Sequence, residues 1–135
     1  MALIDDFQQG RFDMIGYITL GTNDIDRAAK FYDVLLGEIS AGRFMESDSF
    51  IAWATSPDAP GFSVIKPADG NAATIGNGVM IALSVDTKEK VDTLYNKAIE
   101  LGGKDEGAPG PRGNGFYASY FRDLDGNKLN FYCMG

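Results

Sequence analysis

Few residues in this sequence are of the types that perform covalent or metal chemistry. The 135-residue chain contains no histidine and a single cysteine, Cys133. Ser-His-Asp and Cys-His arrangements, in which an imidazole activates the nucleophile, are therefore excluded. Tyr17 remains as a weak candidate for proton transfer, because the ordinary pKa of a tyrosine, about 10, makes it a poor base near neutral pH.

Two other features are suited to binding a ligand. Segment 107–115 is rich in glycine, which predicts a loop at the mouth of a site, and its Arg112 can hold an anion through two parallel hydrogen bonds. Phe44, Phe50 and Trp53 are close enough in sequence to form an aromatic wall for a planar ligand. Each feature has an alternative explanation. Arg112 can instead be solvated at the surface, and the three aromatic residues can instead fill the core.

Charge and composition restrict the class of partner. A net charge of −7 argues against binding to nucleic acid and favours a cationic ligand. A simpler explanation is that the charge keeps the protein soluble. No apolar run approaches the roughly 20 residues of a membrane helix, and Met1–Met14 lacks the apolar stretch of a signal peptide. A lone cysteine forms no internal disulfide, so we expect a cytoplasmic protein.

The chain contains an internal repeat. Aligning Ile18 with Ile81 brings Leu20 onto Leu83 and Tyr32 onto Tyr95, within segments that share one apolar pattern. Self-similarity of this kind indicates a duplicated supersecondary unit.

Each half of the repeat predicts one helix and four strands. The first helix runs from the cap Asn23-Asp24 to Leu36, and the second from Asp86, spaced with Glu89 as a capping box, to Leu101. A strand precedes each helix, at 14–21 and 78–85. The strands that follow are Glu38–Phe44, Phe50–Ala54 and Gly61–Lys66, then Lys104–Gly107, Phe116–Phe121 and Lys128–Cys133.

These elements predict an α+β fold of two βαβββ modules, at about 14–67 and 78–135, after an N-terminal extension at 1–13. Alternate strand residues point to opposite faces, so one face of each sheet is apolar and covered by its helix. The other face is mixed and suits a small-molecule cleft or, alternatively, a solvated or dimer-facing sheet. Its residues include Tyr17, Thr19, Met80, Ala82, Ser84, Lys128, Asn130 and Tyr132.

Two motifs resemble a known family. Gly21–Tyr32, with the sequence GTNDIDRAAKFY, and Tyr120–Leu129, with the sequence YFRDLDGNKL, are similar to the first-helix and last-turn signatures of the vicinal oxygen chelate superfamily. That superfamily includes glyoxalases, extradiol dioxygenases, fosfomycin-resistance proteins and bleomycin-resistance proteins. The resemblance implies curved sheets around a cleft, helices on the outside, and a homodimer.

The resemblance also implies four metal-ligand positions, two in each module. They fall on Tyr17, on Ser63 or its neighbour Ile65, on Met80 and on Asn130. None of these residues supplies the imidazole, thiolate or carboxylate that a catalytic transition metal requires. We therefore expect no metal and no other cofactor.

The leading hypothesis is a metal-free small-molecule-binding protein, similar to the bleomycin-resistance type, that sequesters a cationic or aromatic compound. One alternative is a lyase or isomerase resembling lactoylglutathione lyase that uses acid–base groups without metal; a metal-dependent dioxygenase is disfavoured. A second is a non-catalytic dimeric regulatory or structural subunit. The expected cleft residues are Tyr17, Thr19, Trp53, Ser63, Met80, Ser84, Arg112, Asn130 and Tyr132.

Overall fold

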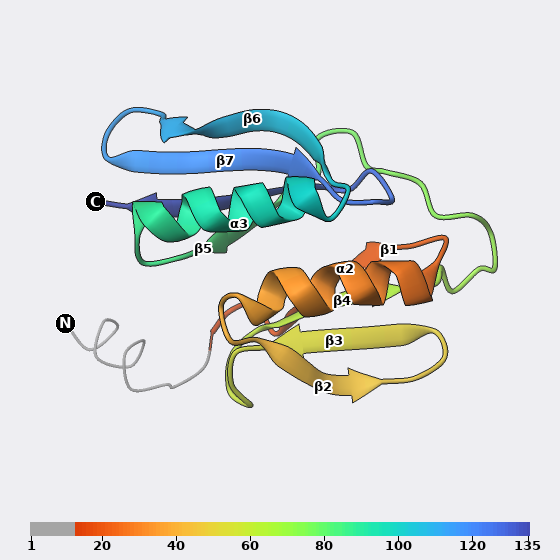
Figure 1. Ribbon diagram of the computed structural model, residues 1–135. Coiled ribbons are helices and arrows are strands. Elements are labelled where there is room, and N and C mark those ends of the chain that lie inside the picture. The colour runs from red at the N-terminus through yellow and green to blue at the C-terminus, as the bar shows by residue number, and fades with distance from the viewer. Residues whose placement is uncertain (1–12) are drawn as a thin grey trace.

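The computed structural model describes residues 13–135 as two successive βαβββ units, and most of the expected extension at 1–13 lies outside these residues. Both helices lie on the same side of the sheets (Figure 1). The first unit contains β1 (Tyr17–Gly21), α2 (Ile25–Gly37), β2 (Gly42–Glu46), β3 (Phe50–Ala54) and β4 (Gly61–Ile65). The second contains β5 (Ile81–Ser84), α3 (Lys88–Glu100), β6 (Lys104–Pro111), β7 (Phe116–Arg122) and β8 (Lys128–Met134).

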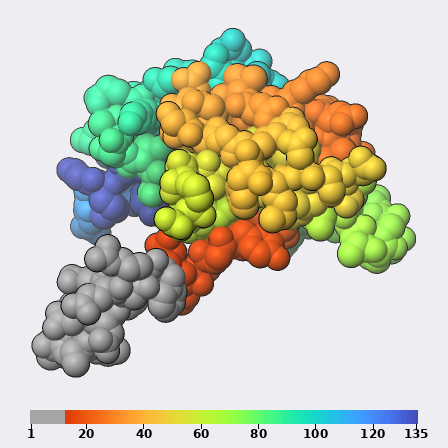
Figure 2. All heavy atoms as spheres, turned by 90° about the horizontal axis from the view of Figure 1, so that it is seen from below, coloured from red at the N-terminus to blue at the C-terminus, as the bar shows by residue number. Residues whose placement is uncertain are grey.

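Each unit builds a four-stranded mixed sheet. The strand orders are β1-β4-β3-β2 and β5-β8-β7-β6, with the repeat-related pairs β1–β4 and β5–β8 parallel and all other pairs antiparallel. The expected α+β fold is confirmed. The linker between the sheets projects from the side of the molecule, green in Figure 2. Among residues 13–135, no helix is both long enough and apolar enough to cross a membrane.

Three strands begin later than predicted. The strand expected from Met14 begins at Tyr17. The strand expected from Glu38 begins at Gly42, because 38–41 continue the helix end as a turn in which Ser40 adopts a φ of 63°. The strand expected from Gly78 begins at Ile81, and Gly78 has a φ of 96°, which a strand does not accommodate.

The glycine-rich segment 107–115 is largely strand, where a loop was expected. Strand β6 continues to Pro111, and the ladder with β7 shifts register between Asp105 and Gly107 and again between Gly107 and Gly110. Because β6 is an edge strand, the missing N–H of a proline is tolerated there. The turn therefore shrinks to residues 112–115, which places Arg112 directly after the strand.

The helix caps agree with the prediction at one helix and differ by one residue at the other. Asp24 caps α2 and accepts a hydrogen bond from the backbone N–H of Arg27. At α3 the cap is Thr87, which accepts from the N–H of Lys90. The expected cap Asp86 forms an ion pair with Lys90 instead.

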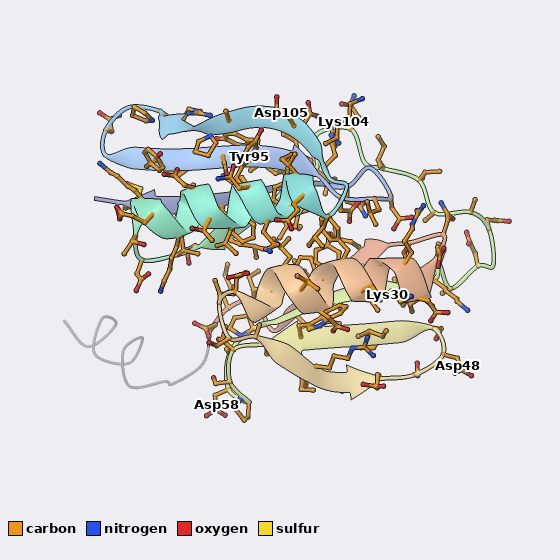
Figure 3. All side chains as sticks on the ribbon, in the orientation of Figure 1. Lys30, Asp48, Asp58, Tyr95, Lys104 and Asp105 are labelled. Carbon is orange, nitrogen blue, oxygen red and sulfur yellow. The ribbon has the colours of Figure 1, made fainter. Side chains whose placement is uncertain are left out.

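Each helix covers the apolar face of its own sheet. Leu35 of α2 is fully buried in the core with Trp53 and Val64, and Val91 of α3 with Phe131. Tyrosine–aspartate hydrogen bonds attach α3 to its sheet: Tyr95 points from the helix to Asp105 of β6, at 2.7 Å (Figure 3), and Tyr117 of β7 donates to Asp92. In the part of the chain that the structure describes, both helices thus pack on one face of their sheets and none on the opposite face.

A buried carboxylate joins the two units. Asp123, in the turn between β7 and β8, accepts from the hydroxyl of Tyr32 on α2 at 2.6 Å. The backbone N–H groups of Asp125 and Asn127 donate to its other oxygen, and the Asn127 amide donates both to Asp123 and to the Gly21 carbonyl of β1. The Asp-Leu-Asp-Gly-Asn segment therefore acts as a junction between the units.

We expect Tyr32→Phe to lower the free energy of unfolding by about 1–3 kcal/mol at neutral pH, because it leaves a buried carboxylate with one donor fewer. Urea denaturation measures the change. The matched control is Tyr95→Phe, which removes the same kind of bond from the exposed Asp105, and we expect a smaller effect. Equal losses in the two variants would contradict a structural role for the junction.

Stability should also depend on alkaline pH through Tyr32. Burial, together with the nearby Asp123 charge, raises the pKa of Tyr32 well above its ordinary value of 10.0. The folded protein thus holds this proton more tightly than the unfolded chain, so the stabilisation is complete below about pH 10 and is lost above it. In denaturation series from about pH 8 to pH 11, the stability gap between wild type and Tyr32→Phe should shrink above about pH 10; a constant gap argues against the linkage.

Candidate functional site

The side of both sheets that faces away from the helices is called the open face here. In the first sheet Thr19 lies opposite Ser63, and in the second Ala82 and Ser84 lie opposite Asn130 and Tyr132. The strand residues that alternate with these, such as Leu20 and Phe131, lie in the core. The expected mixed face therefore exists as one side of each sheet.

Aromatic side chains gather on the open face of the first sheet. The ring of Tyr17, whose side chain is 65% exposed, meets Phe50 edge-on at 6.4 Å. A side chain at Gly61 would come within 3.1 Å of the Phe44 ring and 3.2 Å of Tyr17, so these two residues lie side by side above that glycine. Phe44 and Phe50 thus belong to the expected aromatic wall, with Tyr17 as its third member.

Trp53, expected in the same wall, lies on the other side of the sheet. It is 1% exposed, packs against Tyr32, and donates its indole N–H to Asp33 of α2 at 2.9 Å. Hydrogen bonds from Arg43 and Trp53 lower the pKa of Asp33, so that this carboxylate is charged where it anchors the helix. Phe50 and Trp53 are three residues apart on one strand, and alternation therefore directs them to opposite faces.

The open face of the second sheet carries aromatic and cationic groups together. Tyr132 stacks on Phe116, with ring centroids 5.2 Å apart, and Tyr120 lies directly across the ladder from Asn130. The Arg112 guanidinium and the Lys128 ammonium each lie 5.5 Å from the centre of the Tyr120 ring. Cations prefer this position because the face of an aromatic ring is electron-rich.

Two glycines of β6 make room for Arg112. A side chain at Gly110 would approach the Arg112 guanidinium to 3.1 Å, and one at Gly107 would approach the Tyr120 ring to 3.1 Å. Arg112 can therefore fold back along the strand, where it donates to the carbonyl of Ala108 at 2.7 Å. Glycine in this strand serves close packing of a side chain more than loop flexibility.

Asn130 and Ser63 are the buried polar residues of the open face. Asn130 is 1% exposed, and its side-chain oxygen has no hydrogen-bond partner among the described residues. Ser63 donates its hydroxyl to the carbonyl of Ile18, which leaves it committed to the backbone of β1. Asn130 is thus the buried polar group of this face whose side-chain oxygen the described residues leave without a hydrogen bond.

The two units meet along an apolar groove of about 330 Å³. Met80 of the second unit lines it together with Ile15 and Gly61 of the first. A neighbouring hollow of about 260 Å³ is lined by Ser84 and also by Trp53. The structure therefore brings Met80 close to the strand that carries Tyr17, whereas Arg112, Asn130 and Tyr132 gather on the second sheet.

The sequence-based site omitted Tyr120 and Phe116. The alternation of β7 already placed them together, since Phe116, Ala118 and Tyr120 share one face. The register between β7 and β8 decides which face of β7 packs against α3. That register could not be predicted from the sequence.

The four positions that resemble metal ligands do not fit a transition metal. They offer a phenol at Tyr17, a hydroxyl at Ser63, a thioether at Met80 and an amide at Asn130, whereas such metals select imidazole, thiolate and carboxylate. The Ser63 hydroxyl is also bonded to the backbone. Within residues 13–135, no three side chains of histidine, cysteine, aspartate or glutamate group together in a way that could hold a metal ion.

Comparison with known proteins places the chain in a family. The model of the Glyoxalase/Bleomycin resistance protein/Dioxygenase superfamily matches residues 14–131. The chain belongs to this superfamily. No curated protein matches the sequence.

Solved structures of the superfamily resemble the chain over most of its length. A glyoxalase/bleomycin resistance protein from Albidiferax ferrireducens is 33% identical, with a TM-score of 0.84 over 91% of this chain and 100% of that chain. A glyoxalase/bleomycin resistance protein/dioxygenase family enzyme from Burkholderia phytofirmans is 20% identical, with a TM-score of 0.72, covering 89% and 98%. A lactoylglutathione lyase from Agrobacterium tumefaciens is 19% identical, with a TM-score of 0.68, covering 90% and 93%. The last two likenesses concern the fold alone.

Proposed function

We propose that the chain is a small-molecule-binding member of this superfamily that works without a histidine-ligated metal. The observation that carries the proposal is the aromatic lining of the open face. Rings from Tyr17, Phe44 and Phe50 lie on the first sheet and rings from Phe116, Tyr120 and Tyr132 on the second. Such rings offer a large apolar contact area to a flat organic compound.

The same face offers little support for acid–base catalysis. Tyr17 is 65% exposed, and within residues 13–135 it forms no hydrogen bond with a charged side chain. The carboxylate of Glu106 is bound by the Arg122 guanidinium at 2.5 Å, which lowers its pKa and keeps it ionised and occupied. Binding therefore accounts for the residues of this face better than a lyase or isomerase reaction does.

The binding unit is proposed to be a homodimer, as the family resemblance implies. Large apolar side chains are exposed at and before β1, with Met14 at 89%, Ile15 at 49% and Tyr17 at 65%. Among residues 13–135, strand β1 pairs with β4 alone, and its other edge is available to meet a second copy. The lone cysteine, Cys133, is buried and forms no disulfide, which supports a reducing, cytoplasmic setting.

Binding is tested by titrating the ¹⁵N-labelled protein with small aromatic compounds that are anionic, neutral or cationic, before and after treatment with EDTA. We expect shifts at the backbone amides of Ala118 and Tyr132 that are insensitive to EDTA. Tyr132→Ala should weaken binding by about 0.5–1.5 kcal/mol, the size of an aromatic contact. Tyr95→Ala, on the helix side, is the control. Loss of binding with EDTA would show that a metal is required.

Sedimentation tests the dimer. We expect twice the 14.6 kDa mass of one chain for the wild type. Ile15→Lys should weaken self-association by about tenfold or more, because it places a charge in the contact. Val34→Lys is the matched control, since Val34 is an equally exposed apolar residue, at 46%, on α2. A wild type that sediments as a single chain at all concentrations would contradict the proposal.

A further inference from the structure

We infer that the ligand of the open face is a small aromatic acid whose anionic group is held by Arg112 beside the Tyr120 ring, within the field of Lys128. This inference rests on the proposed binding function and specifies its ligand. It reverses the expectation of a cationic compound that follows from the net charge of −7. A ligand responds first to the groups within a few ångströms, because salt screens charges beyond about 8–10 Å.

Two cations on this part of the face form no ion pair, although the charge of Lys128 is close enough to help lower the pKa of the Glu106 carboxyl. Neither Arg112 nor Lys128 forms an ion pair with any residue in 13–135. A third cation, Arg122, behaves differently, since its guanidinium binds the Glu106 carboxylate and the Gly126 carbonyl. The local charge is therefore positive at Tyr120, within a protein that is acidic as a whole.

Both cations act on an anion that binds beside Tyr120. Each lies 5.5 Å from the centre of that ring, so they are separated by no more than twice that distance. A carboxylate bound by the Arg112 guanidinium therefore also lies within the field of Lys128. Arg112 uses one guanidinium nitrogen to donate to the Ala108 carbonyl, and its other N–H groups can bind a carboxylate.

The neighbouring residues provide for the body of such a ligand. Asn130 lies across the ladder from Tyr120 and keeps an unpartnered oxygen, and the stacked pair Tyr132 and Phe116 follows next on the same face. A flat ring next to the anion can pack on these aromatic groups. A hydrogen-bond donor on the ligand would satisfy the Asn130 amide, since a buried polar group without a partner is costly.

The test compares three compounds of similar shape that differ in charge: benzoate, benzamide and benzylamine. Each is titrated into the ¹⁵N-labelled protein, with the side-chain signals of Arg112 and Asn130 and the backbone amide of Tyr120 as probes. We expect benzoate to shift all three signals and to bind roughly tenfold more tightly than benzamide, as a charge-assisted contact provides. Benzylamine should bind most weakly.

Variants identify the groups that hold the anion. Arg112→Gln should weaken benzoate binding by roughly tenfold and Lys128→Gln by less, and both should leave benzamide binding unchanged. Arg112→Lys should fall between the wild type and Arg112→Gln, because it keeps the charge but loses the planar guanidinium that forms two parallel hydrogen bonds. The matched control is Lys88→Gln, since Lys88 lies 5.7 Å from the ring of Tyr117, a residue on the helix side. Thermal melting confirms that each variant is folded.

The outcomes separate this inference from the function on which it rests. Binding of benzamide or benzylamine at the open face as tightly as benzoate, or unchanged benzoate binding in both glutamine variants, overturns the anionic ligand and leaves the binding function standing. Signals on the open face that fail to respond to compounds of any charge overturn both proposals.

Discussion

The carboxylate of Asp123 is the contact that fixes the two units relative to each other. Its two oxygens accept four hydrogen bonds, from Tyr32, from the N–H groups of Asp125 and Asn127, and from the Asn127 amide. Such a carboxylate is expensive to bury and stable only with its donors in place. Since those donors come from α2 of the first unit and the last turn of the second, the junction holds the helices on one side of the molecule and leaves the sheets open on the other.

The open face follows from this arrangement and from the repeat. Each helix has one apolar stripe, and each stripe covers one face of one sheet. Duplication of the unit therefore produces two uncovered faces, which the junction places on one side. In the second unit, the residues of the open face can change without altering the core under α3. Tyr120 and Asn130 belong to the open face, whereas their neighbours Phe121 and Leu129 point to the helix side and are fully buried.

Much of this could be derived from the sequence. The repeat specified the βαβββ order, and strand alternation specified which residues of β1, β5 and β8 face away from the helices. Alternation also determined that Trp53 lies on the helix side of its sheet, although it was expected in the aromatic wall. Its indole N–H donates to Asp33 of α2. The position of Arg112 could not be derived, because it depends on the length of β6 and on the register shifts near Gly107 and Gly110.

The residues that replace the family's ligand positions are consistent with a change in the kind of recognition. A metal centre holds a ligand by a few strong, directed bonds, whereas the open face offers rings, one unpartnered amide and two cations near Tyr120. Arg112 lies close to Gly107 and Gly110, whose missing side chains leave room for its guanidinium. The net charge of the protein is −7, whereas two cations without ion pairs lie beside the Tyr120 ring. The long-range field is therefore negative, and the groups that a ligand meets near Tyr120 are positive. In the proposed function, the contacts near Tyr120 select the ligand despite the opposite sign of the net charge.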